Sequence, residues 1–392
     1  MERQIDFIAP AIVLTIGLCG AAVSCGSDDT AGGGGASSGG ASSGGTSSGG
    51  TSSGGTAGGG TAGVGAVGSG GAAGAGASAS GGASGGGGVG AGGSAGIPPD
   101  KQNLRVAFFG DTTSGNNFKS VLGLGVTDKA DFILGGGDYD YSYKPAAWIA
   151  AMNSVVGADY PIFGAVGNHD HTTWAPYATE FKKRMTKAGI TPDDPDFTDE
   201  KFSMVYRGLK IVFVGQNGKN TEFADFIKKE FAADDHIWRL CVWHKNQKAM
   251  QVGGKGDEMG WPVYENCRDA GAIILTAHEH SYQRTKTLTN MANQTVDTTC
   301  SDAKKLCVGP GRTFTVVSGL GGNNVRDQNR CLPATYPYGC KQEWALIYTS
   351  NQSATYGTLF LDFYVDGDPK KAKGYFRNVK NEIVDQFDIT KD

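Results

Sequence analysis

Between Thr30 and Pro99 the sequence contains no charged residue and no aromatic residue, and it consists almost entirely of Gly, Ala, Ser and Thr. Such a composition cannot bury enough apolar surface to offset the entropy that ordering removes. The repeated units GGASSGG and GGTSSGG are confined to this region. We therefore predict that residues 26–99 form a flexible Gly/Ser/Ala/Thr tether, and that residues 100–392 form the folded part of the chain.

A surplus of positive charge is also missing. The sequence has 35 Lys and Arg residues against 39 Asp and Glu residues, a formal net charge of −4. Proteins that bind nucleic acid use basic surfaces to neutralise phosphates, so we expect no nucleic-acid partner. An uncharged tether also cannot serve as a polybasic membrane patch. The sequence gives no indication of the oligomeric state.

The N-terminus carries an apolar run of signal-peptide length, Phe7–Leu18, followed by small residues and Cys25 in AAVSCGSDD. This pattern resembles a bacterial lipoprotein signal, in which the cysteine is lipidated and becomes the first mature residue. We expect residues 1–25 to be such a signal peptide, with membrane contact only through a lipid anchor at Cys25. Cleaved secretion and an uncleaved anchor are the alternatives. Each exports the domain, so we expect a bacterial outer-membrane lipoprotein or a secreted or periplasmic protein.

Cysteine usage also indicates export. Apart from Cys19 and Cys25, the chain has six cysteines, an even number that favours disulfides in an exported protein. Closeness in sequence favours Cys300 with Cys307 and Cys331 with Cys340, which leaves Cys241 for Cys267. A structural zinc site is disfavoured because these spacings are not those of zinc knuckles.

Short apolar runs that end in Gly or polar residues predict buried strands within 104–111, 130–138, 160–170, 209–217, 237–245 and 271–280. Helical spacing of apolar residues lies between them, at Ala146–Val156, Tyr177–Ala188, Glu222–Ala233 and Val263–Ala270. Further strands are predicted within 313–322, 357–367, 372–380 and 382–390. This order predicts a mixed α/β fold with two packed mixed β-sheets flanked by helices.

Polar residues follow several of these strands, at the edge where open α/β sheets gather their chemistry. They are Asp111, Asp138, Asn168-His169-Asp170, His244, His278 and His280. Any one of them could be a turn residue or a hydrogen-bonded histidine. Together they include four of the six histidines in the chain, and oxygen with imidazole donors is what a pair of metal ions requires. In an extended chain His278 and His280 lie on the same side, so each can serve one of two neighbouring metals.

Five motifs occur in order: GDTT (110–113), GDYDY (137–141), GNHD (167–170), CVWH (241–244) and AHEH (277–280). This ordered set resembles that of the calcineurin-like metallophosphoesterases, and within them most closely the purple acid phosphatases. The resemblance covers residues 104–285 and implies an αββα sandwich. The departures are Thr113 for Gly, Cys241 for Val and Ala277 for Gly. They remove no ligand if Tyr141 replaces a histidine of the first motif.

Carried over to matching positions, the resemblance implies one metal on Asp111, Asp138, Tyr141 and His280, and a second on Asp138, Asn168, His244 and His278. Asp138 would bridge the two ions. Because a phenol has a pKa near 10, a tyrosine ligand favours a strongly polarising ion. We therefore expect Fe3+ with Fe2+, Zn2+ or Mn2+. The alternative for Tyr141 is an aromatic side chain that lines the site without ligating, and Tyr139 or Tyr143 could be confused with it.

The resemblance also implies that His169 contacts the phosphate and protonates the leaving group, with Asp170 orienting it as an acid–base pair. Four more residues are candidates for substrate binding, although each could be structural: His171, Lys245, Asn246 and Arg284. The segment VGGKG (252–256) lacks the spacing of a P-loop and is interpreted as a mobile flap.

These observations predict an exported dinuclear phosphatase that hydrolyses small phosphate monoesters by attack of a metal-activated hydroxide. One alternative is a Mn- or Zn-dependent phosphodiesterase or nucleotide hydrolase of the same superfamily. A second is a non-catalytic surface binding protein with a structural metal site.

Overall fold

The computed structural model describes residues 102–192, 200–216 and 220–392. The predicted signal peptide (1–25) and tether (26–99) lie outside the described residues.

One of two seven-stranded sheets contains the first strands of the described chain. Its order is β11 (Lys305–Val308), β16 (Ile383–Lys391), β15 (Lys371–Asn378), β14 (Gly357–Phe363), β1 (Leu104–Phe109), β2 (Phe132–Gly135) and β3 (Ile162–Gly164). Strands β1, β2 and β3 are parallel, and β14, β15 and β16 pair antiparallel. The carboxyl ends of β1, β2 and β3 therefore meet at one edge of this sheet.

The second seven-stranded sheet has the order β13 (Trp344–Tyr348), β8 (Tyr282–Thr285), β12 (Thr315–Ser318), β7 (Ile273–Thr276), β6 (Trp238–Val242), β5 (Leu209–Phe213) and β4 (Phe202–Tyr206). Its central strands β5, β6, β7 and β12 are parallel. A separate small sheet pairs β9 (Leu288–Asn290) with β10 (Thr295–Val296).

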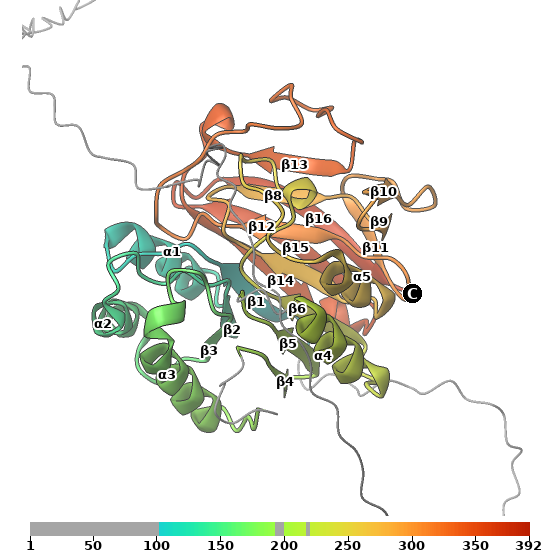
Figure 1. The fold of residues 1–392 in the computed structure, drawn as a ribbon. Coiled ribbons are helices and arrows are strands. Elements are labelled where there is room, and N and C mark those ends of the chain that lie inside the picture. The colour runs from blue at the N-terminus through green and yellow to red at the C-terminus, as the bar shows by residue number, and fades with distance from the viewer. Residues whose placement is uncertain (1–101, 193–199, 217–219) are drawn as a thin grey trace, which may run out of the picture. The chain divides into compact units, whose positions relative to one another are not determined.

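The two large sheets pack face to face, and helices cover their outer faces. Phe108 and Leu134 of the first sheet share a core with Leu240 and Leu275 of the second. Helices α1 (Asn116–Thr127), α2 (Pro145–Val156) and α3 (Trp174–Lys187) cover the first sheet, and α4 (Asn220–Ala232) and α5 (Trp261–Asp269) cover the second (Figure 1). Strands buried on both faces read as continuous apolar runs, and this is why they could be predicted. The predicted αββα sandwich is confirmed.

The sequence did not predict α1 or the strands β4, β8, β9, β10, β11 and β13. Helix α1 contains Gly123 and Gly125, which have low helix propensity. It still forms because Phe118, Val121 and Leu122 are buried against the first sheet and its neighbouring helices. Strand β8 is a buried strand of largely polar composition, so it carries no apolar run.

Three disulfides join the cysteine pairs expected from the sequence. Cys241–Cys267 links β6 to α5, while Cys300–Cys307 and Cys331–Cys340 close short loops. Across the described residues, no helix combines the length and apolar character needed to cross a membrane.

Candidate metal centre

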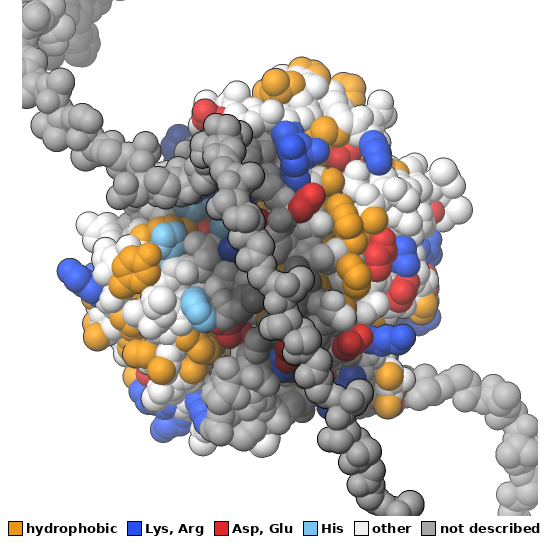
Figure 2. Space-filling model, in the orientation of Figure 1, with side chains coloured by type: hydrophobic (Ala, Val, Ile, Leu, Met, Phe, Trp, Pro, Cys, Tyr) orange, Lys and Arg blue, Asp and Glu red, His pale blue; other side chains and the backbone are white. Residues whose placement is uncertain are grey.

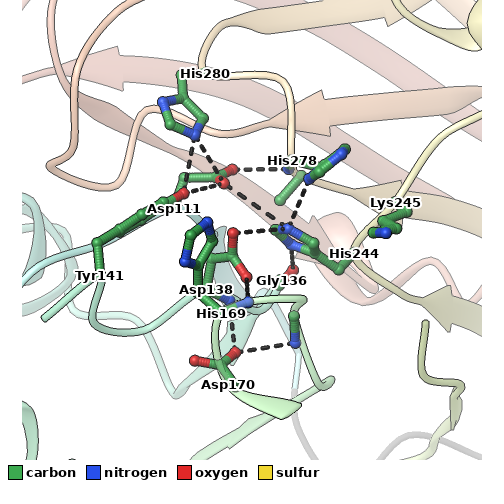
Figure 3. Close-up of polar contacts among 12 residues, drawn as sticks. Asp111, Gly136, Asp138, Tyr141, His169, Asp170, His244, Lys245, His278 and His280 are labelled. Carbon is green, nitrogen blue, oxygen red and sulfur yellow. Dashed lines mark hydrogen bonds and ion pairs between the residues drawn. The ribbon is translucent and has the colours of Figure 1, made fainter. Parts of the chain in front are cut away.

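The polar residues that follow β1, β2, β3, β6 and β7 gather at one place between the two sheets. Figure 3 shows the side chains of Asp111, Asp138, Tyr141, His244 and His280 directed toward one another, with His278 beside His244. Asp111, Asp138 and Tyr141 come from the first sheet, and the three histidines come from the second. The structure therefore brings together side chains that the sequence expectation named as ligands.

Three of these residues form a compact donor set. Asp138, His244 and His278 are all buried, and each offers a ligand atom within 4.8 Å of the other two. Nε2 of His244 lies 3.1 Å from Oδ2 of Asp138 and 3.0 Å from Nδ1 of His278. Imidazole nitrogens that face a carboxylate at this separation fit a borderline divalent metal.

Hydrogen bonds on the far side of each imidazole fix which nitrogen faces the centre. Nδ1 of His244 donates to the carbonyl oxygen of Gly136 at 2.8 Å, and this bond directs Nε2 toward Asp138. Nε2 of His278 lies 2.8 Å from the Glu258 carboxylate, and Nδ1 of His280 bonds to Asn324. Such outer partners are typical of histidines that bind metal. Sequence reasoning missed Glu258, for which no motif gives a signal.

Tyr141 lies on the other side of the centre. Its hydroxyl donates to Oδ1 of Asp111 at 2.8 Å and lies 2.9 Å from Nε2 of His280. Tyr139 instead donates to the carbonyl oxygen of Ala165 at 2.8 Å. Of the three tyrosines that the sequence left in competition, Tyr141 is therefore the one that reaches these two candidate ligands.

Two carboxylates keep the centre negative. Burial acts to raise the pKa of Asp111, but nearby His280 and His244 keep it below its usual range. Burial likewise opposes ionisation of Asp138, and His244 brings its pKa to about 2. Burial, followed by the charges of Asp111 and Asp138, raises the pKa of Tyr141 well above its ordinary value. A cation is therefore needed to bind Tyr141 as phenolate.

Asn168 carries a buried side-chain oxygen, Oδ1, with no hydrogen-bond partner among the described residues. An unsatisfied buried acceptor costs free energy that a bound cation would offset. Asn168 thus fits the ligand role that the resemblance implied for it.

The backbone at the centre is strained. Asp111, Asp138 and His278 have positive φ values of 58°, 55° and 70°, a region that residues with a side chain rarely adopt. A Cβ at Gly167 would lie 2.2 Å from the backbone nitrogen of Asp138, so this position requires glycine. Strain of this kind clusters at functional sites.

His169 lies beside the centre (Figure 3). Its backbone N–H donates to Oδ1 of Asp138 at 2.8 Å, and its ring packs on Tyr141 with centroids 4.4 Å apart. Nδ1 lies 3.1 Å from the hydroxyl of Tyr143. Burial is the main cause of the lowered pKa of His169.

The expectation that Asp170 orients His169 is corrected. The Asp170 carboxylate accepts hydrogen bonds from the backbone amides of Asp138, Tyr139 and Gly167, at 2.6, 2.8 and 2.9 Å. It therefore holds the loops after β2 and β3 together, while Tyr143 contacts the imidazole.

Two of the four substrate-binding candidates have structural roles instead. Arg284 is buried, and its guanidinium pairs with both carboxylate oxygens of Asp385, at 2.7 and 2.9 Å. Asn246 is also buried, and its amide donates to the carbonyl oxygen of Ala277 at 2.6 Å. Both polar groups are occupied within the fold, so we correct these two predictions.

The other two candidates have partners at or near the surface. Nζ of Lys245 lies 3.4 Å from Glu258, the carboxylate that also contacts His278. The side chain of His171 bonds to Glu200 at 2.6 Å. Lys245 therefore reaches the centre only through Glu258. A role of Lys245 or His171 in substrate binding stays a prediction.

The family of the region that carries the metal centre follows from its similarity to known proteins. Residues 104–282 match the model of the calcineurin-like phosphoesterases. These residues belong to the calcineurin-like phosphoesterase family. The match spans all five motifs, and it supports a phosphoester hydrolase whose buried Asp/His/His cluster fits a metal site.

A solved structure with a TM-score above 0.5 shows a similar fold. The purple acid phosphatase PPD1 from seeds of yellow lupin (Lupinus luteus) is 16% identical, with a TM-score of 0.55 over 76% of this chain and 56% of its own. This chain thus covers little more than half of the lupin enzyme. GAP50, the anchor in the inner membrane complex of Plasmodium, is 11% identical, with a TM-score of 0.48 over 74% of this chain and 89% of its own. No curated protein matches the sequence.

Proposed function

We propose that this calcineurin-like protein is an exported dinuclear phosphatase of the purple acid type, acting on small phosphate monoesters. The observation that carries the proposal is the position of the Tyr141 hydroxyl, which is 2.8 Å from Asp111 and 2.9 Å from His280. A phenol between a carboxylate and an imidazole is a donor set for a strongly polarising ion such as Fe3+.

The donors divide into two groups that share Asp138. Asp111, Tyr141 and His280 would hold Fe3+, and Asn168, His244 and His278 would hold Fe2+, Zn2+ or Mn2+. When bound, such a pair supplies Lewis acidity at the phosphoryl oxygens and a lowered pKa for water.

The residues of the chain itself supply positioning and a proton. His169 is held from one side by Tyr143, through Nδ1, and packs on the ring of Tyr141. Its Nε2 is then the nitrogen that protonates the leaving oxygen of the monoester. Asp170 contributes indirectly, because it ties the backbone of the ligand Asp138 to the loop that carries His169.

Export is the second part of the proposal. Three disulfides fit an oxidising compartment, and the sequence around Cys25 fits lipid attachment. Replacing Cys25→Ser should move the protein from the membrane fraction to the soluble fraction of the producing cells. Unchanged membrane association of Cys25→Ser would rule out this anchor.

The decisive measurement is the metal content and visible spectrum of the full-length protein, produced in an oxidising compartment. We expect iron and a coloured protein whose visible band disappears in Tyr141→Phe. Tyr143→Phe is the matched control, because this neighbouring tyrosine contacts His169 instead, and it should keep the band. A colourless protein with two Mn or Zn ions would contradict the iron centre and favour the phosphodiesterase or nucleotide hydrolase of the same superfamily.

Turnover tests the reaction class. We expect hydrolysis of phenyl phosphate to exceed that of diphenyl phosphate, and Asp138→Asn to abolish both, since one carboxylate would serve both metals. A variant Asp138→Asn with wild-type turnover would refute hydrolysis at this centre. Retained metal without turnover on either ester would favour the binding protein.

A further inference from the structure

The glycine-rich loop 252–256 is fastened against the metal centre. The amide of Val252 donates to the Gln283 side chain at 2.8 Å, and its carbonyl oxygen accepts from the amide of Asn329 at 2.9 Å. The next residue, Gly253, packs so closely that a Cβ there would lie 2.1 Å from the carboxyl carbon of Glu279. The loop therefore places its following residues beside the segment that carries the candidate ligands His278 and His280.

Lys255 extends from this loop to the centre. Its half-buried ammonium donates to the backbone carbonyl oxygen of His278 at 2.5 Å. Its positive charge contributes to lowering the pKa of His169 as well as that of His278. Lys255 thus lies within electrostatic range of the two histidines between which a phosphate would be processed. Among the described residues it forms no ion pair.

Arg326 is a second cation at the same place. Its backbone amide donates to the carbonyl oxygen of His280 at 2.9 Å. Its guanidinium has no ion pair or hydrogen bond within the part of the chain that the structure describes. Lys255 and Arg326 thus contact the carbonyl oxygens of His278 and His280, which are separated by a single residue. After burial, the charge of Arg326 is the largest cause of the lowered pKa of Lys255.

Both cations are partly buried and have no ion-pair partner among the described residues, so each is available to pair with a bound anion. Burial raises the pKa of Glu279, and the charges of Lys255 and Arg326 oppose this rise. The Glu279 carboxyl group is buried against Gly253, and its Oε2 has no hydrogen-bond partner in the described residues. The two cations together could bind an anionic group. The ammonium of Lys255 supplies a compact charge, and the guanidinium of Arg326 supplies a planar set of hydrogen-bond donors.

We propose that Lys255 and Arg326 form a subsite for a second anionic group of the substrate, beside the phosphate that is hydrolysed. The inference rests on the proposed phosphatase function and deepens it. The substrate class is then a phosphate monoester whose leaving group carries another phosphate. A substrate without that group leaves both cations unpaired, and this difference gives the specificity.

The test compares propane-1,3-diyl bisphosphate with propyl phosphate, which have the same carbon chain and differ by one phosphate. The full-length, metal-loaded protein should have the higher kcat/KM for the bisphosphate. In Lys255→Met/Arg326→Gln the ratio of the two kcat/KM values should fall about tenfold, the loss expected for charge-assisted contacts. Lys248→Met is the matched control, because Lys248 is exposed on the neighbouring segment, and it should keep the wild-type ratio.

A binding measurement separates failure of the subsite from failure of the proposed function. Calorimetry with propane-1,3-diylbisphosphonate and propylphosphonate needs no turnover. Preferential binding of the bisphosphonate that disappears in the variant would support the subsite even if neither ester is hydrolysed. Equal ratios in the wild type and the variant, in kinetics or in binding, would overturn it. Should the double variant not fold, the single variant Arg326→Gln gives the same comparison.

Discussion

At the scale of single residues, the candidate centre depends on hydrogen bonds to the imidazole nitrogens that point away from it. Glu258 contacts Nε2 of His278 and so leaves Nδ1 directed at His244. Burial opposes its ionisation, but the hydrogen bond from His278 lowers the pKa of Glu258 to about 2. Glu258 is therefore a carboxylate that holds the imidazole in one orientation.

Replacing Glu258→Gln should weaken binding of the divalent ion about 10- to 100-fold, because outer partners of metal-binding histidines have effects of this size. The dissociation constant can be measured by competition with a chromogenic chelator. Asp257→Asn is the control, since this neighbouring carboxylate accepts from the amide of Lys248 instead. Equal affinities in both variants would remove Glu258 from the centre.

Tyr143 gives a second prediction at this scale. Its hydroxyl is the partner of His169 Nδ1, so Tyr143→Phe should lower kcat about tenfold by releasing the imidazole, with metal content unchanged. The pH–rate profile should shift as well, because the environment of the imidazole changes. A variant with wild-type kcat and an unshifted profile would show that Tyr143 does not position His169.

Sequence reasoning named residues that the structure brings together, such as Asp138 and His244 at the ends of parallel strands, and their role as ligands stays a prediction. It failed where position in the chain differed from position in space. Arg284 is four residues from His280 but is buried against Asp385. Asp170 adjoins His169 but binds backbone amides. Lys255 and Arg326 come from loops whose contacts no local pattern encodes.

At the scale of elements, the centre depends on how strand ends are held. The disulfide Cys241–Cys267 ties the end of β6, three residues before His244, to the buried face of α5. The apolar runs made β6 and β7 predictable. Helix α1 was missed because its glycines lower the helix propensity of the segment. Strand β8 was missed because its buried side chains are largely polar and form no apolar run.

Removing this link should destabilise the protein more than removing a short loop disulfide. Chain entropy predicts a loss of about 3.5 kcal/mol for Cys241→Ala/Cys267→Ala and about 2.4 kcal/mol for Cys300→Ala/Cys307→Ala. The sequence separations are 26 and 7 residues. Urea unfolding of both variants measures the difference. The reverse order of stabilities would show that chain entropy does not dominate.

At the scale of the whole molecule, the described part of the face in Figure 2 shows basic side chains interspersed with acidic and apolar ones. The absence of a nucleic-acid partner stays a prediction. The larger feature is internal: the buried carboxylates Asp111 and Asp138 lie where two sheets meet.

Metal removal should therefore destabilise the fold. At metal concentrations a thousandfold above Kd, binding contributes about 4 kcal/mol, which corresponds to a decrease in Tm on the order of 10 °C after chelation. Differential scanning calorimetry with and without chelator measures it. Asp138→Asn, which lacks the shared ligand, should respond much less. A chelator-insensitive wild-type Tm would mean that the metals do not stabilise the native state.

The two halves of the donor set belong to different sheets, with Asp111, Asp138 and Asn168 on one and His244, His278 and His280 on the other. Bound metal would thus add a cross-link between two layers that otherwise meet through apolar side chains and a few polar contacts, such as the Arg284–Asp385 pair. Separation of the layers would then require breaking coordination bonds as well. The rate at which isotopically labelled metal exchanges with solution would then report how often the two sheets separate transiently in the native state. This rate can be measured without unfolding the protein.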